Sequence, residues 1–254
     1  MTASIMIVTY NRLELTKKTL DNIFKTTKYP YNIIFVDNGS IDGTVEYLDK
    51  TLYQKTEHFE SFRDYAIISN KDNLGIAIGR NQCLREAVRK YDDDWLVTFD
   101  NDVAVPDGWL TEAIDILKLN PQYASIGVNF EDKTFPIIKL NGKEFQHKNQ
   151  GNLGTACMVF NKSLHKMLGY FNHTDYGKYG EEDADWGMRT RVIGFQLGYI
   201  KENGKHLGSG SYDTGPYRKF KTDSHKKNLL KFNQNCRDYT RRVKPLYIKF
   251  NEKN

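Results

Sequence analysis

The chain has 254 residues, enough for one large α/β domain with a sizeable core. Its composition, with 39% hydrophobic and 27% charged residues, is that of a folded protein and not of a disordered one. No apolar run approaches the ~18 to 20 residues of a membrane-spanning helix, and the amino terminus lacks the pattern of a signal peptide. We therefore expect a cytoplasmic protein whose three cysteines are free thiols rather than a disulfide framework or a zinc cluster.

The first hundred residues alternate short apolar runs with segments of helical periodicity. We expect strands at residues 4–8, 31–36, 66–69 and 95–99, and helices that begin near residues 13, 44 and 76. This alternation implies right-handed crossovers and a mostly parallel sheet. Ligands of such sheets bind beyond the carboxyl ends of the strands. Since each predicted strand ends in a polar break, these breaks should converge on one crevice.

The pattern changes after a predicted helix at residues 109–119. Strands are expected at residues 125–128, 135–140, 155–160 and 195–200, with a hairpin turn at Asn141-Gly142. Residues 183–193 and 224–239 have the periodicity of helices, and the glycine-rich segment 204–215 is expected to be a mobile loop. The second half of the chain should therefore be mixed in topology.

The charge is unevenly distributed along the chain. Residues 217–250 contain eleven lysines and arginines against two aspartates, a net charge of +9, whereas the whole chain has +5. Such asymmetry indicates an anionic partner, either nucleic acid, an anionic lipid surface or a phosphorylated substrate. A solvated basic helix without a partner is the alternative, so the carboxyl-terminal segment leaves two interpretations open.

Two carboxylates follow the fourth predicted strand. Asp100 and Asp102 flank one residue on the turn after a buried run. Hard cations such as Mg²⁺ and Mn²⁺ prefer carboxylate oxygen, and Mg²⁺ is commonly held by one or two carboxylates together with substrate phosphates. Aspartate and asparagine are also ordinary turn residues. The position at the end of a predicted strand favours a metal site for a diphosphate.

Five segments occur in a recognisable order: 4–12 (SIMIVTYNR), 36–44 (VDNGSIDGT), 73–81 (NLGIAIGRN), 99–102 (FDND) and 180–189 (GEEDADWGMR). Together they resemble the motifs of family 2 glycosyltransferases. The resemblance implies a single GT-A domain, an α/β fold with a Rossmann-like, mostly parallel sheet flanked by helices. Residues 1–103 would form the half that binds the nucleotide sugar and residues 104–215 the mixed acceptor and catalytic half. Residues 216–254 would be a basic extension with a carboxyl-terminal helix.

The resemblance assigns the donor-binding residues. Thr9 would border the nucleoside, and Asp37 would accept a hydrogen bond from the base, which in this family is typically uracil of a UDP-sugar. Arg80 would face the diphosphate, while Asn81 would help to shape the same wall. Asp100 would lie near the ribose.

The resemblance also assigns the metal and the chemistry. Asp102, together with His206, would hold Mn²⁺ or Mg²⁺ on the diphosphate of the nucleotide sugar. Asp183 corresponds to the general base that takes the proton of the acceptor hydroxyl, and a single base opposite the leaving group implies inversion at the anomeric carbon. The extra glutamate in the motif leaves Glu182 and Asp185 as alternatives for the base.

The acceptor side is assigned through small and acidic residues. The segment Gly154-Thr155-Ala156 resembles the one that lets the acceptor approach the anomeric carbon. Glu182 and Trp186, which lie within the catalytic motif, would be on the same side, although packing in the core is the expected role of a tryptophan here. The crowded carboxylates of residues 181–185 should raise the proton affinity of the cluster.

The acceptor itself stays open at this point. It would be a glycan or glycoconjugate, or, as for transferases of bacteriophages, DNA with hydroxymethylated bases in a bacterial or virus-infected cell. The basic segment would equally suit a location at the surface of a membrane. A nucleotidyltransferase is less favoured, because no Gly-x-Gly-x-x-Gly stretch lies near the amino terminus. A binding module without enzymatic activity would leave the acidic motifs unexplained.

Overall fold

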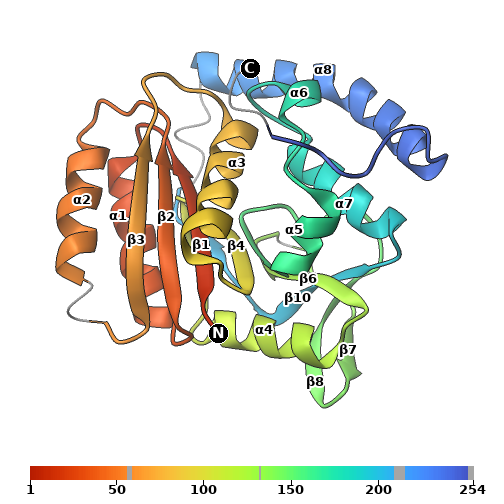
Figure 1. Ribbon diagram of the computed structural model, residues 1–254, viewed down its shortest axis with the longest axis horizontal. Helices are drawn as coiled ribbons and strands as arrows, with labels where there is room; N and C mark the ends of the chain where they lie inside the picture. Colours follow the sequence, from red (N-terminus) through yellow and green to blue (C-terminus); the bar gives the residue numbers. More distant parts are fainter. Residues whose placement is uncertain (56–58, 132, 209–214, 251–254) are drawn as a thin grey trace.

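The structure is a computed structural model that describes residues 1–55, 59–131, 133–208 and 215–250 (Figure 1). A nine-stranded sheet in the order β3-β2-β1-β4-β9-β6-β10-β8-β7 forms its centre. Its strands are β1 (Ala3–Thr9), β2 (Tyr31–Asp37), β3 (Phe62–Ser69), β4 (Trp95–Asp100), β6 (Tyr123–Asn129), β7 (Ile137–Leu140), β8 (Lys143–Lys148), β9 (Cys157–Asn161) and β10 (Gln196–Asn203). A separate antiparallel pair joins β5 (Val103–Ala104) to β11 (Lys205–His206).

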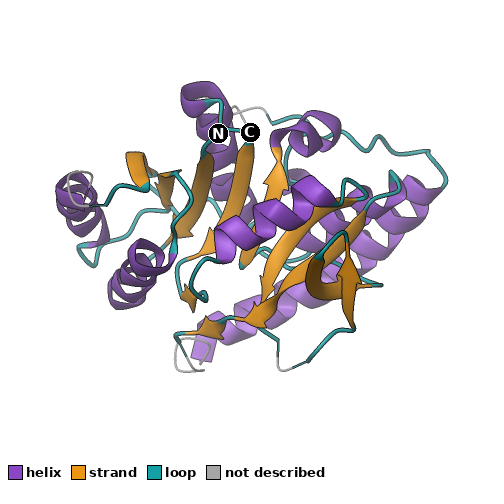
Figure 2. Cartoon of the chain, turned by 90° about the horizontal axis from the view of Figure 1, so that it is seen from below, coloured by secondary structure: helices purple, strands orange, loops and turns teal. Residues whose placement is uncertain are grey.

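The helices lie on both sides of this sheet (Figure 2). They are α1 (Leu13–Thr26), α2 (Thr44–Lys55), α3 (Ile76–Glu86), α4 (Trp109–Leu119), α5 (Lys162–Leu168), α6 (His173–Tyr176), α7 (Glu182–Val192) and α8 (Gly215–Thr240). A π-helical turn, Ala87–Tyr91, continues α3. None of the described helices combines the length and the apolar character needed to cross a membrane.

The sheet is parallel in one half and mixed in the other. Strands β3, β2, β1 and β4 run parallel, β9 is antiparallel to both of its neighbours β4 and β6, and β10 is parallel to β6. The β7–β8 hairpin forms the far edge. The prediction of an α/β fold with a mostly parallel sheet and a mixed second half is confirmed.

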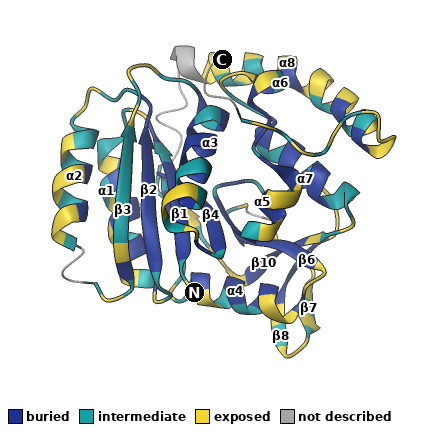
Figure 3. Cartoon of the chain, in the orientation of Figure 1, coloured by how far each residue is buried: buried dark blue, intermediate teal, exposed yellow. Residues whose placement is uncertain are grey.

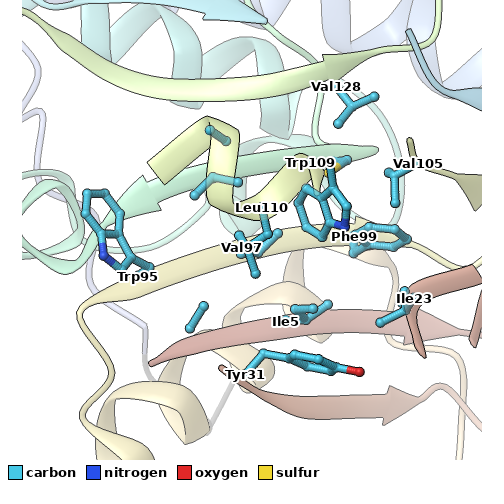
Figure 4. Close-up of a cluster of buried hydrophobic side chains, with 14 of the residues drawn as sticks. Ile5, Ile23, Tyr31, Trp95, Val97, Phe99, Val105, Trp109, Leu110 and Val128 are labelled. Carbon is cyan, nitrogen blue, oxygen red and sulfur yellow. The ribbon is translucent and has the colours of Figure 1, made fainter. Parts of the chain in front are cut away.

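Alternate residues of the strands face two separate cores, as the period of two in a strand requires. Odd-numbered residues of β1 such as Ile5 pack with α1, α2 and α4, where Trp109 lies 5.5 Å from Phe99, measured between ring centroids (Figure 4). Even-numbered residues such as Met6 pack with α3, α5 and α7. The central strands β1, β2, β4 and β6 are therefore buried on both faces (Figure 3).

Several elements differ from the sequence-based expectation. Strand β8, the pair β5 and β11 and the short helices α5 and α6 were not predicted, and α8 begins at Gly215 rather than at residue 224. Of the loop predicted at 204–215, residues 205–206 form β11, and residues 209–214 lie outside the described residues. All three cysteines are free.

Candidate active site

The carboxyl ends of β1, β2 and β4 meet at one edge of the sheet, as predicted. Asp37, the last residue of β2, is buried, and its Oδ2 accepts hydrogen bonds from the backbone nitrogens of Gly39 (3.1 Å) and Ser40 (2.8 Å). The Ser40 hydroxyl donates to Oδ1 at 2.5 Å. Because a carboxylate has about four acceptor positions, this turn fixes Asp37 and still leaves room for one further donor.

Thr9 and Asn101 tie the ends of β1 and β4 together. The Asn101 amide donates to Thr9 Oγ1 at 2.9 Å and to Thr16 Oγ1 at 3.2 Å, and all three residues are buried. The backbone oxygen of Thr9 accepts from Asn38 N at 2.9 Å. The structure therefore places Thr9 beside Asp37, at the border of the predicted nucleoside site.

Asp102 and His206 are brought together by the β5–β11 pair. His206 pairs with Val103, the neighbour of Asp102, and the Asp102 carbonyl accepts from Leu207 N at 2.7 Å. Burial raises the pKa of Asp102 and the charge of Asp100 adds to the rise, while Arg12 and His206 oppose it. In the sequence, only the family resemblance relates Asp102 to His206. In the structure, the β5–β11 strand pair brings the two residues together.

Arg12 was not among the predicted site residues. Its Nη1 donates to Asp102 Oδ2 at 2.6 Å, across 90 positions of the sequence. Arg12 ends the first motif, which is the signal that could have pointed to it, but no spacing rule relates it to Asp102. The guanidinium supplies positive charge at the carboxylate that was predicted to bind the metal.

The donor set at Asp102 and His206 fits a hard or borderline divalent cation. Carboxylate oxygen and imidazole nitrogen both suit Mn²⁺, and carboxylate suits Mg²⁺. In the described part of the chain no group of three or more histidine, cysteine or acidic residues could hold a metal ion. A cation here would therefore need the oxygens of a bound diphosphate to complete its coordination.

Arg80 joins the two acidic motifs. This buried side chain of α3 donates from Nη2 to Asp100 Oδ1 at 3.0 Å and from Nη1 to Glu182 Oε1 at 2.8 Å. The first of these carboxylates ends β4 and the second begins α7. The predicted donor side and the predicted catalytic side are therefore parts of a single site, with a fixed cation between them.

Asp183 lies at the start of α7 and is half-buried. Its Oδ1 accepts a hydrogen bond from Ala184 N at 2.7 Å. Its Oδ2 faces Gly154, where an added β-carbon would lie 4.0 Å from the oxygen. Gly154 has a φ of +69°, and its neighbour Thr155 is buried. The small-residue segment predicted for the acceptor side therefore borders the predicted base.

Glu182 is buried, and its Oε2 has no hydrogen-bond partner among the described residues. Burial raises the pKa of Glu182 to about 7, and the charge of Asp183 adds to this rise against the effect of Arg80. Burial also raises the pKa of Glu181, which contacts His225 of α8 at 2.5 Å. The predicted rise in proton affinity is thus found in the two glutamates of the cluster.

Asp185, in contrast to Glu182 and Asp183, is bonded on all sides by side chains of the surrounding helices. It is fully buried and accepts hydrogen bonds from Arg189 Nε (2.6 Å), Tyr176 Oη (2.8 Å) and Tyr239 Oη (2.8 Å). All of these donors come from α6, α7 and α8. Its carboxylate therefore anchors the helices, and among the alternatives for the base Asp183 and Glu182 are left.

Two predicted site residues lie behind the site rather than on its surface. Asn81 is fully buried, and its side chain bonds the backbone nitrogen and oxygen of Phe171 (2.8 and 2.9 Å). Trp186 is 1% exposed and stacks on the Phe171 ring at 4.7 Å. The predicted places of Asn81 on the donor wall and of Trp186 on the acceptor side are corrected accordingly, because both side chains support the site from the core.

A pocket of about 250 Å³ is lined by residues of the predicted acceptor side and by the predicted metal ligand His206. Gly154 and His206 border it, and Phe130, Glu131, Lys148 and Tyr199 lie among its other lining residues. Burial raises the pKa of Tyr199, and the charges of Glu131 and Asp183 contribute to the rise. A larger, open hollow of about 690 Å³ beside α4 and the β7–β8 hairpin is lined by none of the predicted site residues.

Comparison with known proteins identifies the family. Residues 4–180 match the family described as glycosyl transferase family 2, and this match covers more than half of the chain. The chain therefore belongs to glycosyl transferase family 2, as the motifs predicted. No curated protein sequence matches it significantly.

Solved structures show the same fold. The mannosyltransferase PcManGT from Pyrobaculum calidifontis, in complex with GDP-Man and Mn²⁺, has a TM-score of 0.61 at 18% identity over 83% of this chain and 58% of its own. S. aureus TarS 1–349 in complex with UDP has a TM-score of 0.61 at 16% identity, over 80% of this chain and 59% of its own. GalNAc-T7 with UDP, GalNAc and Mn²⁺ has a TM-score of 0.64 at 15% identity, over 94% of this chain and 50% of its own. The chain spans between half and three-fifths of these structures, and the similarity confirms the GT-A fold.

Proposed function

We propose that the chain is an inverting glycosyltransferase that moves a sugar from a nucleoside-diphosphate sugar, a UDP-sugar, to a hydroxyl of a glycan or glycoconjugate. The observation that carries this proposal is the contact of Arg80 with both Asp100 and Glu182. It joins the turn expected to hold the diphosphate to the helix that carries the expected base. The nucleotides bound by the structural neighbours, GDP-Man in one and UDP in two others, support a nucleotide-sugar donor.

Asp183 would act as the general base. It takes the proton of the acceptor hydroxyl while the acceptor oxygen bonds to the anomeric carbon, and the bond from that carbon to the diphosphate breaks with its electron pair on the leaving group. Base catalysis of this kind contributes roughly 10² to 10⁴-fold. Because acceptor and leaving group lie on opposite sides of the carbon, a single displacement inverts its configuration.

The cations of the site would oppose the charge of the diphosphate. Mn²⁺ or Mg²⁺ held by Asp102 and His206 would supply Lewis-acid stabilisation of the leaving group. Arg80 is held in place by two carboxylates, so its charge is oriented before the substrate binds. Mn²⁺ in the structures of PcManGT and GalNAc-T7 supports a divalent cation here.

A polyanionic acceptor is a second candidate, because α8 presents basic side chains to solvent. Lys219, Lys226, Lys227 and Arg237 are exposed on it, while Asn228, Asn235 and Tyr239 form the opposite, buried face. This arrangement favours an acceptor on a charged carrier, such as DNA with hydroxymethylated bases or a glycolipid in an anionic surface.

The stereochemistry of transfer tests the proposal. Purified protein with Mn²⁺ would be incubated with a panel of nucleotide α-sugars and with acceptors that include glycosides and hydroxymethylated duplex DNA. The expected result is transfer from a UDP-sugar that gives a β-linked product, read from the anomeric proton coupling by NMR. An α-linked product would contradict the single displacement at Asp183.

A further inference from the structure

The pocket between Gly154 and His206 has the position of an acceptor site. Gly154 lines this pocket, and a β-carbon added to it would lie 4.0 Å from Asp183 Oδ2. On the other side, His206 lies against the Phe130 ring, with ring centroids 5.4 Å apart. A group in this pocket would therefore lie between the predicted base and the predicted metal ligand, where the acceptor hydroxyl has to be placed.

The wall of the pocket is held by α7. The Arg191 side chain donates to the backbone oxygens of Gly151 (2.7 Å) and Lys148 (2.6 Å). Tyr199 Oη donates to Leu153 O at 2.8 Å. Gly187 allows Asn152 to pack on the helix, since a β-carbon at this glycine would lie 2.5 Å from Asn152 Cβ. Asp183 and the pocket wall are therefore fixed to the same helix.

The pocket also contains an ion pair. Lys148 Nζ lies 3.1 Å from Glu131 Oε1 and 4.0 Å from the centroid of the Phe135 ring. The Lys148 side chain is 11% exposed and that of Glu131 is 47% exposed. Lys148 is thus held by an anion and a ring, whereas Glu131 keeps acceptor capacity toward a ligand.

We propose that this pocket binds the terminal sugar ring of the acceptor and that this ring carries no charge. The inference rests on the proposed transferase function and names the acceptor that the same site takes. A volume of about 250 Å³ equals that of roughly eight water molecules at about 30 Å³ each. It has room for one sugar ring. Aromatic walls with a few fixed polar groups are typical of pockets for such ligands.

The charges explain why the ring is uncharged. The charge of Lys148 is already balanced by Glu131, and Asp183 adds a negative charge beside Gly154 of the pocket wall. A carboxylate or phosphate on the ligand would be repelled by both acidic side chains, and the Lys148 ammonium in the pocket wall is already paired with one of them. Hydroxyl groups, in contrast, can donate to Glu131 and exchange hydrogen bonds with the Asn152 amide.

Two variants and a matched control test the inference. The probe is a panel of methyl glycosides that contains uncharged sugars and one glucuronide. Acceptor activity is measured as the release of nucleoside diphosphate, and binding is measured by ligand-observed NMR. Glu131→Gln removes the charge and Asn152→Ala keeps the β-carbon that packs on Gly187. Glu144→Gln is the control, because Glu144 is an exposed partner of Lys201 in the other hollow. Affinities for UDP and for the UDP-sugar with Mn²⁺ are measured in parallel.

We expect an uncharged glycoside to bind and the glucuronide not to. Glu131→Gln should raise the glycoside's Kd and KM about tenfold, as for a hydrogen bond that loses its charged acceptor, and Asn152→Ala should raise them roughly twofold to tenfold, as for loss of a hydrogen bond between neutral groups. Glu144→Gln should leave both constants unchanged. Unchanged acceptor constants in both pocket variants, or preferred binding of the glucuronide or of hydroxymethylated DNA in the pocket, would overturn the inference. A fall in affinity for the UDP-sugar but not for UDP would assign the pocket to the donor sugar and overturn it too. Failure of the wild type to bind any nucleotide would instead refute the proposed function.

Discussion

Neighbouring carboxylates of one short motif have different roles because their surroundings differ. Asp183 is half-buried and faces Gly154, Glu182 is buried against Arg80, and Asp185 is enclosed by Arg189 and two tyrosine hydroxyls. Spacing along a helix cannot distinguish a base from a structural anchor when the carboxylates lie within four positions. The environment of each side chain makes the distinction, and it favours Asp183, which is less buried than Glu182 and Asp185, as the proposed base.

Replacement of the proposed base gives the first prediction. Asp183→Asn should lower the turnover rate at least about 10²-fold, the lower end of the contribution of a general base, with little change in donor affinity. Turnover and the affinity for nucleoside diphosphate would be measured separately, with Asp107→Asn as an exposed control outside the site. Turnover close to that of the wild type would move the role of base to Glu182.

The raised pKa of Glu182 predicts a pH dependence of stability. The pKa is about 7 in the folded protein, against an ordinary value of 4.5. Between these values the folded state retains a proton that the unfolded state has lost, so this group lowers the free energy of unfolding as pH rises from about 4.5 to about 7. In Glu182→Gln this contribution is absent, and the variant should gain stability relative to the wild type between pH 5 and pH 8.

Urea denaturation of both proteins at several pH values measures this difference. Other titrating groups cancel in the comparison, because the two proteins differ at one position. A stability difference that stays constant between pH 5 and pH 8 would show that Glu182 titrates in its ordinary range.

Polar contacts hold the basic helix α8 against the rest of the fold. Asn228 donates to the backbone oxygens of Tyr176 (2.7 Å) and Tyr179 (2.8 Å), and Asn235 donates to Tyr176 Oη (2.7 Å). Tyr239 completes the contact at Asp185. The buried face of α8 is therefore mainly polar, and hydrogen bonds rather than apolar packing hold it on α6 and α7. These contacts also support the segment that leads into Asp183.

Loss of one of these amides should loosen α8. Asn235→Ala removes the bonds to Tyr176 and to Asp175 (3.0 Å) and leaves the Lys244 ammonium without one partner. We expect a loss of about 1 to 3 kcal/mol in the free energy of unfolding, as for a buried polar group left unsatisfied. Faster amide exchange in α8 should accompany it. Asn233→Ala, on the exposed face, is the matched control, and equal effects of the two changes would contradict this account of docking.

The sequence predicted the elements whose residues have a clear period, and it missed those held by polar contacts. Short apolar runs that end in polar breaks located β1, β2 and β4 and predicted that their carboxyl ends converge on one crevice. The mainly polar strand β8 and the two-residue strands β5 and β11 have no such pattern, since pairing with distant partners defines them. For the same reason the ion pair of Arg12 with Asp102 and the pocket beside Lys148 could not be read from spacing. Asn81 and Trp186 were misplaced because motif position does not reveal burial.

At the scale of the whole molecule, the basic surface of α8 predicts a salt-dependent interaction. Changing Lys226, Lys227, Arg237 and Arg241 to glutamine should weaken binding of a polyanionic acceptor and flatten its dependence on salt, by about 0.9 in logarithmic slope for each lost phosphate contact with duplex DNA. Arg242 is left intact because it donates to Val192 O at 3.1 Å. Two measurements distinguish DNA from an anionic lipid surface as the partner: filter binding to DNA and sedimentation with anionic vesicles, each at several salt concentrations. If neither binds even at low ionic strength, α8 is a solvated surface.

The most direct test of the central claim is calorimetric titration of the protein with nucleoside diphosphates, with and without Mn²⁺. We expect UDP to bind, Mn²⁺ to strengthen its binding, and Asp102→Asn to remove most of this metal-dependent gain. The fold should be retained in the variant, because Asp102 lies on a partly exposed turn. Binding of UDP that is the same with and without Mn²⁺ in the wild type, or the same metal-dependent gain in Asp102→Asn, would contradict a metal-assisted nucleotide-sugar site at Asp102.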